Sequence, residues 1–134
     1  MRFVFDTNVI IRATLLPDSV PSQAIIKAEA AGVVLYSEET LLELFQVLER
    51  PKLSLYIQKT AIAEFYARVL MNWQHVSILQ RVNDCRDKND NKFLELALNG
   101  DANIIVSGDK DLLTMNPYRA ISIITPSVFL REFQ

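Results

Sequence analysis

Short runs of β-branched and aliphatic residues alternate along the chain with longer segments in which apolar residues recur every three or four positions. The short runs predict buried strands, and the longer segments predict amphipathic helices that cover them. The expected strands are Arg2–Phe5, Val33–Tyr36, Val76–Leu79, Asn103–Val106 and Ile121–Ile124. The expected helices lie at Pro21–Ala31, between Ser37 and Pro51, at Leu55–Trp73, between Asp90 and Gly100, at Lys110–Leu113 and at Pro126–Glu132.

Residues at the ends of these segments support the assignment. Gly32 and Gly100 follow helical patterns and are typical of helix C-termini. Ser37 is a suitable N-cap for the helix after the second strand, with two glutamates following it in the first turn. Pro51 is expected to end that helix.

Strands separated by helices must pair in parallel, because the chain returns to the same edge of the sheet before each new strand. The pattern therefore predicts an α/β fold, a three-layer α/β/α sandwich with a central, mainly parallel sheet. The length of 134 residues suits one domain, expected to span residues 1–134. Ligands of such open sheets bind at the carboxyl ends of the strands.

Half of the residues are hydrophobic, but 22% are charged, and no apolar run approaches the roughly 18 residues that span a bilayer. An acidic residue, Asp6, interrupts the N-terminus too early for the apolar core of a signal peptide. We therefore expect a cytoplasmic protein.

The chain contains one cysteine, Cys85, and one histidine, His75, so a zinc site of cysteines and histidines is disfavoured. His75 lies where a helix is expected to lead into a strand, a position more typical of a structural or surface histidine than of a hydrolase triad. The three glycines form no phosphate-binding motif.

Acidic residues occur where this fold binds ligands. Asp6 directly follows the first strand, and Asp109 follows the strand NIIV. Glu43 lies on the helix after the second strand, and Asp90 opens the helix before NIIV. Carboxylates that meet without histidine or cysteine repel one another unless a cation intervenes. Mg²⁺ or Mn²⁺, which prefer oxygen ligands, would be the expected occupant.

Each acid also has an ordinary structural interpretation. Asp90 suits a helix N-cap, Asp109 suits a turn, and Glu43 suits a solvated helix face. Asp6 is harder to explain in this way, because a carboxylate at a buried strand end needs partners. The combination of the four residues, more than any one of them, favours a functional site.

The ordered motifs FVFDTNVIIRA, YSEETLLELFQVLERPKL and RDKNDNKFLELALNGDANIIVSGDKDLL resemble the PIN-domain family. Within that family they are similar to a bacterial subfamily of toxin components. The resemblance covers nearly the whole chain. One departure is Lys88, where the subfamily often has proline, and this change removes no carboxylate.

The resemblance assigns the catalytic and metal-binding roles to four acids, Asp6, Glu43, Asp90 and Asp109. It places further polar groups around them, Thr7, Asn8, Asp87, Ser107 and Asp111, as indirect ligands or caps. It implies hydrolysis of RNA phosphodiester bonds by water activated on one or two Mg²⁺ or Mn²⁺ ions. It also implies a type II toxin–antitoxin pair, with a cognate antitoxin protein and a homodimeric toxin.

The net charge of −2, taken alone, argues against a nucleic-acid partner, but the distribution of the charges matters more than their sum. Setting aside the six acids of the expected site leaves 10 acids against 14 lysines and arginines elsewhere. Four basic residues close in sequence to the site are candidates for contact with RNA phosphates: Arg12, Lys88, Lys92 and Lys110. Each also fits a solvated surface position.

Two expectations concern particular segments. Asp90 should meet the positive end of its helix, which would lower its pKa, whereas Asp87 should lie in a loop and reach metal ions only indirectly. The region Leu55–Trp73 carries four aromatic residues, and we expect some of them to contribute to a dimer interface as an alternative to the core.

Other functions fit less well. A Mg²⁺-dependent phosphohydrolase usually has a second aspartate two residues after the first, where this chain has Asn8. Flap-type DNA nucleases resemble the pattern but are longer, with additional DNA-binding helices. A PIN-like module that binds RNA or protein without cutting it remains the main alternative.

Overall fold

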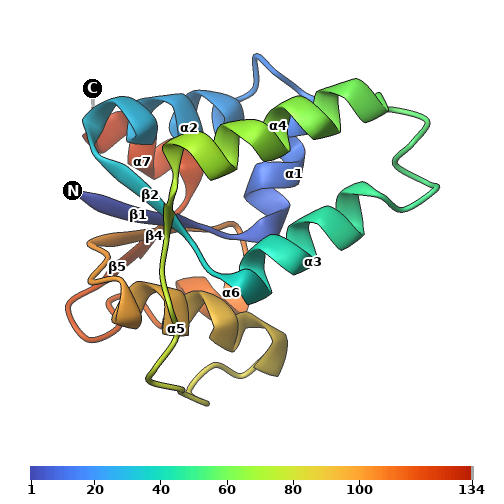
Figure 1. The fold of residues 1–134 in the computed structure, drawn as a ribbon. Coiled ribbons are helices and arrows are strands. Elements are labelled where there is room, and N and C mark those ends of the chain that lie inside the picture. The colour runs from blue at the N-terminus through green and yellow to red at the C-terminus, as the bar shows by residue number, and fades with distance from the viewer. Residues whose placement is uncertain (134) are drawn as a thin grey trace.

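Five strands form the central sheet in the computed structural model, which describes residues 1–133 (Figure 1). The spatial order is β3-β2-β1-β4-β5, and every neighbouring pair is parallel. The strands are β1 Arg2–Phe5, β2 Val33–Tyr36, β3 Gln74–His75, β4 Ile104–Val106 and β5 Ser122–Ile124. The helices are α1 Thr7–Leu15, α2 Val20–Ala31, α3 Glu38–Leu48, α4 Lys59–Asn72, α5 Asn91–Asn99, α6 Lys110–Leu113 and α7 Pro126–Glu132, with a 3₁₀ turn, η1, at Lys88–Asp90.

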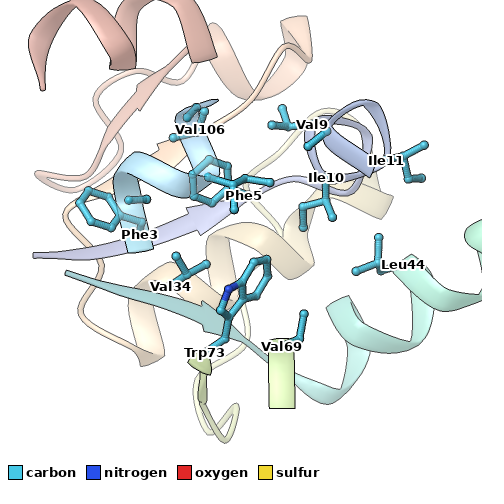
Figure 2. Close-up of a cluster of buried hydrophobic side chains, with 14 of the residues drawn as sticks. Phe3, Phe5, Val9, Ile10, Ile11, Val34, Leu44, Val69, Trp73 and Val106 are labelled. Atoms are coloured by element: carbon cyan, nitrogen blue, oxygen red, sulfur yellow. The ribbon is translucent and has the colours of Figure 1, made fainter. Parts of the chain in front are cut away.

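Helices cover both faces of this sheet, which confirms the predicted three-layer α/β/α architecture (Figure 1). Side chains of α1, α2, α3, α4 and α7 pack in one core, and those of α5 and α6 pack in the other. Successive residues of a strand point to opposite faces. Phe3 and Phe5 therefore enter the first core, shown in Figure 2, whereas Val4 enters the second.

Helix α1 was not among the predicted helices. Its sequence, TNVIIRATL, contains several β-branched residues, which have weak helix propensity. The helix forms because Asp6 caps it, accepting a hydrogen bond from the Val9 N–H, and because Val9, Ile10 and Ile11 are buried in the core. Asp6 thus ends β1 and begins α1 with no intervening loop.

Helix α4 begins later than the pattern predicted. The expected helix from Leu55 starts only at Lys59, because residues 51–57 form turns that bury Ile57 while leaving Leu55 and Tyr56 exposed. The aromatic residues of this region divide between interior and surface. Phe65 and Trp73 are buried and pack edge to face, whereas Tyr56 and Tyr66 are exposed.

The predicted strand Val76–Leu79 is also misplaced, because pairing with β2 stops at Gln74–His75. Beyond the Val76 N–H, which donates to the Tyr36 carbonyl, the chain leaves the sheet. Asn99 Oδ1 accepts hydrogen bonds from the Leu79 and Gln80 N–H groups, each 2.9 Å long, in place of ladder bonds. His75 is exposed on this edge strand, as expected for a surface histidine.

Two predicted helix ends have different physical causes. Ser37 caps α3 in a reciprocal capping box with Thr40, as its sequence position suggested. Gly32 ends α2 with an extended backbone, so a left-handed conformation is not the reason for glycine there. A Cβ atom at Gly32 would lie 2.0 Å from the Met1 carbonyl oxygen, and glycine therefore permits β1 and β2 to approach.

Among residues 1–133, no helix combines the length and the apolar character needed to cross a membrane.

Candidate active site

Adjacent parallel strands bring the first two predicted acids together. Phe5 of β1 pairs with Val106 of β4, so the chain leaves both strands at the same edge of the sheet. Asp6 directly follows β1, and Asp109 follows β4 after Ser107 and Gly108. The site therefore lies at the carboxyl ends of the strands, as expected for an open parallel sheet.

All four acids of the predicted quartet line one pocket of about 220 Å³ at this edge. The pocket also contains Thr7 and Asn8, two of the predicted surrounding residues. Its other lining residues are Val47, Arg50, Asn89 and Phe93. The pocket thus collects residues from α1, α3, the η1–α5 segment and the loop after β4.

Asp6 is held in place by hydrogen bonds to both carboxylate oxygens. Oδ1 accepts from the Val9 N–H at 2.9 Å, and Oδ2 accepts from the Ser107 hydroxyl. Asp6 is only 3% exposed, and this burial is the main reason that its pKa is raised, with the Asp109 charge adding to the effect. Ser107, predicted to surround the site, acts here by positioning Asp6.

Glu43 has the opposite electrostatic environment. Its Oε2 accepts hydrogen bonds from Lys92 Nζ and Asn89 Nδ2, and its Oε1 accepts from the Thr7 hydroxyl. Burial alone would raise the Glu43 pKa, but these three hydrogen bonds and the Lys92 charge outweigh it, so the pKa is lowered. Lys92 is therefore an ion-pair partner of Glu43 in this structure, a contact that sequence analysis did not predict.

Asp90 is buried at the junction of η1 and α5, where the positive end of the helix was expected to lower its pKa. That expectation is wrong, because Asp90 has a helical backbone and its side chain makes no capping hydrogen bond. Burial raises its pKa to about 7, and the nearby carboxylates of Asp109, Asp87 and Asp6 contribute. The local helix end matters less than acids brought in from other elements.

Asp109 caps α6 by accepting a hydrogen bond from the Asp111 N–H at 2.7 Å. Its own N–H donates to Ser107 Oγ at 2.9 Å, which connects it to Asp6 through one hydroxyl. Asp111, predicted to surround the site, thus contributes its backbone to the position of Asp109. The loop SGD is held as a unit by these contacts.

Asp87 lies closer to the other acids than a purely indirect role requires. It caps η1 by accepting a hydrogen bond from the Asn89 N–H at 3.0 Å, and a cap was one of the two roles predicted for it. Its carboxylate is also grouped with those of Asp90 and Asp109, and one oxygen from each lies within 4.8 Å of the others. These three carboxylates are called the aspartate triad below.

The aspartate triad is electrostatically unfavourable without a cation. Two unit charges at this separation repel by roughly 3 kcal/mol at an effective dielectric constant of about 20. Within residues 1–133, Asp90 Oδ2 is buried and has no hydrogen-bond partner. An oxygen-only set of anionic ligands with one unsatisfied buried oxygen fits a hard divalent cation such as Mg²⁺ or Mn²⁺.

Basic residues flank the acidic pocket on two sides. Arg50 lines the pocket itself and was not among the predicted basic residues, although it follows Glu43 by seven positions, or about two helical turns, just past the end of α3. Arg12 lies in an adjoining pocket that shares Asn8 and Asp109 with the acidic one. Lys88 and Lys110, the other predicted basic residues, are exposed.

Solved structures share this fold. VapBC2 from Rickettsia felis, solved bound to a DNA fragment from their promoter, matches with a TM-score of 0.62 and 14% identity over 92% of this chain and 97% of that chain. PAE2754 from Pyrobaculum aerophilum matches with a TM-score of 0.61 and 12% identity over 98% of this chain and 88% of that chain. At these identities the comparison establishes the fold alone.

Sequence comparison establishes the family. The uncharacterized protein MJ1680 of Methanocaldococcus jannaschii is 32% identical over 148 aligned positions, which cover 100% of this chain and 92% of that protein. The profile of the PIN domain matches residues 2–111, a span that contains all four acids of the pocket. The chain therefore belongs to the PIN domain family.

Proposed function

We propose that this PIN-domain protein is a cytoplasmic, Mg²⁺- or Mn²⁺-dependent endoribonuclease that hydrolyses RNA phosphodiester bonds. The observation that carries the proposal is the convergence of Asp6, Glu43, Asp90 and Asp109 on one pocket. The lining of this pocket contains no serine, cysteine or histidine that could form a nucleophilic triad. Hydrolysis by activated water is the reaction that such a set of carboxylates supports.

The proposed roles of the residues follow from their contacts. A bound divalent cation lowers the pKa of its water and neutralises charge on a phosphoryl oxygen. Asp90 and Asp109 present carboxylates that lack a cation partner among the described side chains. Ser107 fixes the orientation of Asp6, and Lys92 keeps Glu43 ionised in the pocket.

Recognition of RNA is proposed to rest on the basic residues beside the pocket. Arg50 lines the acidic pocket, and Arg12 lies in the neighbouring one, so an extended phosphate backbone could contact both. Lys88 and Lys110 are exposed close to site acids and add to the positive charge around the pocket. Lys92 contributes less than first expected, because Glu43 already neutralises it.

The direct test is cleavage of a mixed RNA pool by the purified protein with Mg²⁺ or Mn²⁺. We expect internal cleavage that requires the cation, stops on chelation and is absent from Asp90→Asn protein prepared in parallel. The same assay with single-stranded and duplex DNA tests the preference for RNA. RNA binding without cleavage under every metal condition would instead favour a non-catalytic PIN-like module.

We further propose that the protein is the toxin of a type II toxin–antitoxin pair. The support is the set of motifs that resemble bacterial toxin components, together with the fold that the chain shares with VapBC2. Expression of the wild-type chain should arrest growth, and co-expression of the product of the adjacent reading frame should relieve the arrest. Growth arrest by the Asp90→Asn variant would argue against toxicity through the acidic pocket.

The proposed assembly is a homodimer of chains that each form one PIN domain over residues 1–134. Segments beyond the profile match belong to the same cores, because β5 pairs with β4 and α7 packs on α2. The exposed side chains of Tyr56, Tyr66, Leu70 and Met71 supply apolar surface suited to an interface. Light scattering at high micromolar concentration should give the dimer mass, and a persistent monomer would contradict it.

A further inference from the structure

The acids around the pocket differ in what already satisfies them. Both oxygens of Asp6 accept hydrogen bonds from within the protein. Glu43 accepts three hydrogen bonds, one of them from the charged amine of Lys92. These two members of the quartet therefore have local partners in the folded chain.

The aspartate triad is not satisfied in this way. Within residues 1–133, Asp87, Asp90 and Asp109 form no ion pair with a lysine, arginine or histidine. Asp87 and Asp109 each accept a backbone hydrogen bond from the following turn with Oδ1, so Oδ2 of each takes no part in capping. Asp90 is only 7% exposed, and its Oδ2 is buried without any partner in the described chain.

From this contrast we infer that Asp87 is a direct ligand of the divalent cation, which Asp87, Asp90 and Asp109 hold together. This assignment rests on the proposed metal dependence and refines it. Glu43, which the family resemblance assigns to the metal, instead forms an ion pair with Lys92 at the wall of the pocket. The unsatisfied oxygen of Asp90 and the neighbouring oxygens of Asp87 and Asp109 are the ligands that a cation would complete.

The position of Asp87 allows a selective test. Asparagine at this position keeps an Oδ1 that can cap η1, so Asp87→Asn removes the charge while preserving the local structure. Asp111→Asn is the matched control, because it removes an equal charge from a carboxylate outside the aspartate triad and keeps the backbone N–H that donates to Asp109. The readout is Mn²⁺ binding to the full chain without RNA, followed by the electron paramagnetic resonance signal of free Mn²⁺ and by calorimetry.

We expect Asp87→Asn to weaken Mn²⁺ affinity by more than about 100-fold, which exceeds the roughly 10–100-fold loss caused by removing an indirect partner, and Asp111→Asn to weaken it by less than about threefold. The double variant Glu43→Gln, Lys92→Gln removes the ion pair without changing the net charge, and it should also stay within about threefold of wild type. Equal losses in Asp87→Asn and Asp111→Asn would show a general charge effect and overturn the assignment. A larger loss in the double variant than in Asp87→Asn would overturn it as well.

This experiment separates the ligand assignment from the proposed activity. A wild-type protein that binds Mn²⁺ through Asp87 but cleaves no RNA would contradict the ribonuclease and support the assignment. Cleavage of RNA by a protein whose Mn²⁺ affinity does not depend on Asp87 would support the ribonuclease and contradict the assignment. Wild-type protein that binds no Mn²⁺ would overturn both.

Discussion

The carboxylates of Asp90 and Asp109 lie within 4.8 Å of each other at the carboxyl edge of the sheet, although one begins α5 and the other begins α6. Their mutual repulsion contributes to the raised pKa of Asp90, in addition to its burial. Such a contact is costly for the folded protein unless a proton or a cation is shared between the two groups. The site is therefore expected to lower the stability of the folded protein as long as no cation is bound.

The first consequence concerns stability without metal. Replacing Asp90 by Asn removes one charge from the aspartate triad and supplies an amide that can donate to Asp109. At pH 8 in the presence of a chelator, Asp90→Asn should melt about 3–6 °C higher than wild type. Differential scanning calorimetry measures this change, with Asp18→Asn in an exposed loop as the control. A lower melting temperature for Asp90→Asn would contradict a repulsive cluster.

The second consequence is a pH dependence of stability. The pKa of Asp90 is raised from its ordinary 3.8 to about 7 in the folded chain, so between these values the folded state holds a proton that the unfolded state has lost. The resulting stabilisation is present below about pH 4 and is lost as the pH rises through about 7.

Urea unfolding in the presence of a chelator across this range measures the free energy of unfolding of wild type and of Asp90→Asn. As the pH rises, the free energy of unfolding of the variant should increase relative to that of wild type. The comparison cancels the contribution of Glu43, whose lowered pKa acts in the opposite direction at lower pH. A difference that stays constant between pH 4 and pH 8 would show that Asp90 titrates normally.

Asp6 and Asp109 provide the third prediction. Each lies in the pocket and keeps its backbone hydrogen bond when replaced by Asn, since asparagine retains a cap acceptor. Asp6→Asn and Asp109→Asn should therefore stay folded while losing RNA cleavage by at least about 100-fold at saturating Mn²⁺. Single-turnover cleavage, checked against circular dichroism of each variant, measures the loss. Full activity of Asp6→Asn would remove it from the site.

Three of the four acids of the pocket could be located from the apolar pattern, because Asp6, Asp90 and Asp109 each lie beside a strand or helix end. Glu43 lies in the interior of α3, and only the family resemblance singled it out. Asp6 follows a buried strand, and Asp109 follows another, so parallel pairing alone places them together. The sequence also predicted the layers of the sandwich, since strands and helices alternate along most of the chain.

What could not be predicted depends on contacts between distant segments. The predicted direction of the Asp90 pKa shift was wrong, because burial of the carboxylate, together with the charge of Asp109, outweighs the local helix end. The Glu43–Lys92 ion pair joins α3 to α5, and no local sequence motif indicates it. Helix α1 was not predicted, because its β-branched sequence is stabilised as a helix by burial in the core, and intrinsic helix propensity does not include that contribution.

The Glu43–Lys92 pair gives the fourth prediction. Both side chains are largely removed from solvent, so losing one partner leaves a poorly solvated charge. Lys92→Gln should lower the free energy of unfolding by about 1–2 kcal/mol, an effect between those of exposed and fully buried ion pairs. Adding Glu43→Gln to that variant should recover part of the loss. A double-mutant cycle from urea unfolding measures the coupling, and strictly additive losses would mean that the two groups do not interact.

Arg50 carries the last prediction, on RNA binding. It is exposed at the end of α3 and lines the acidic pocket, where its charge can neutralise a phosphate that approaches the carboxylates. Removing a single phosphate contact should reduce the slope of log affinity against log salt by about one, with little dependence on RNA sequence. Arg50→Ala should therefore bind a short RNA more weakly at low salt, whereas its Mn²⁺ affinity should not fall, because no carboxylate is lost.

The matched control for this measurement is Arg119→Ala. Arg119 lies in the loop before β5, where it pairs with Asp84, and it does not line the acidic pocket. Fluorescence anisotropy of a labelled RNA at several salt concentrations, with Asp90→Asn as the background to prevent cleavage, gives the slope for each variant. A slope unchanged by Arg50→Ala but reduced by Arg119→Ala would place the RNA against the loop before β5 and not beside Arg50.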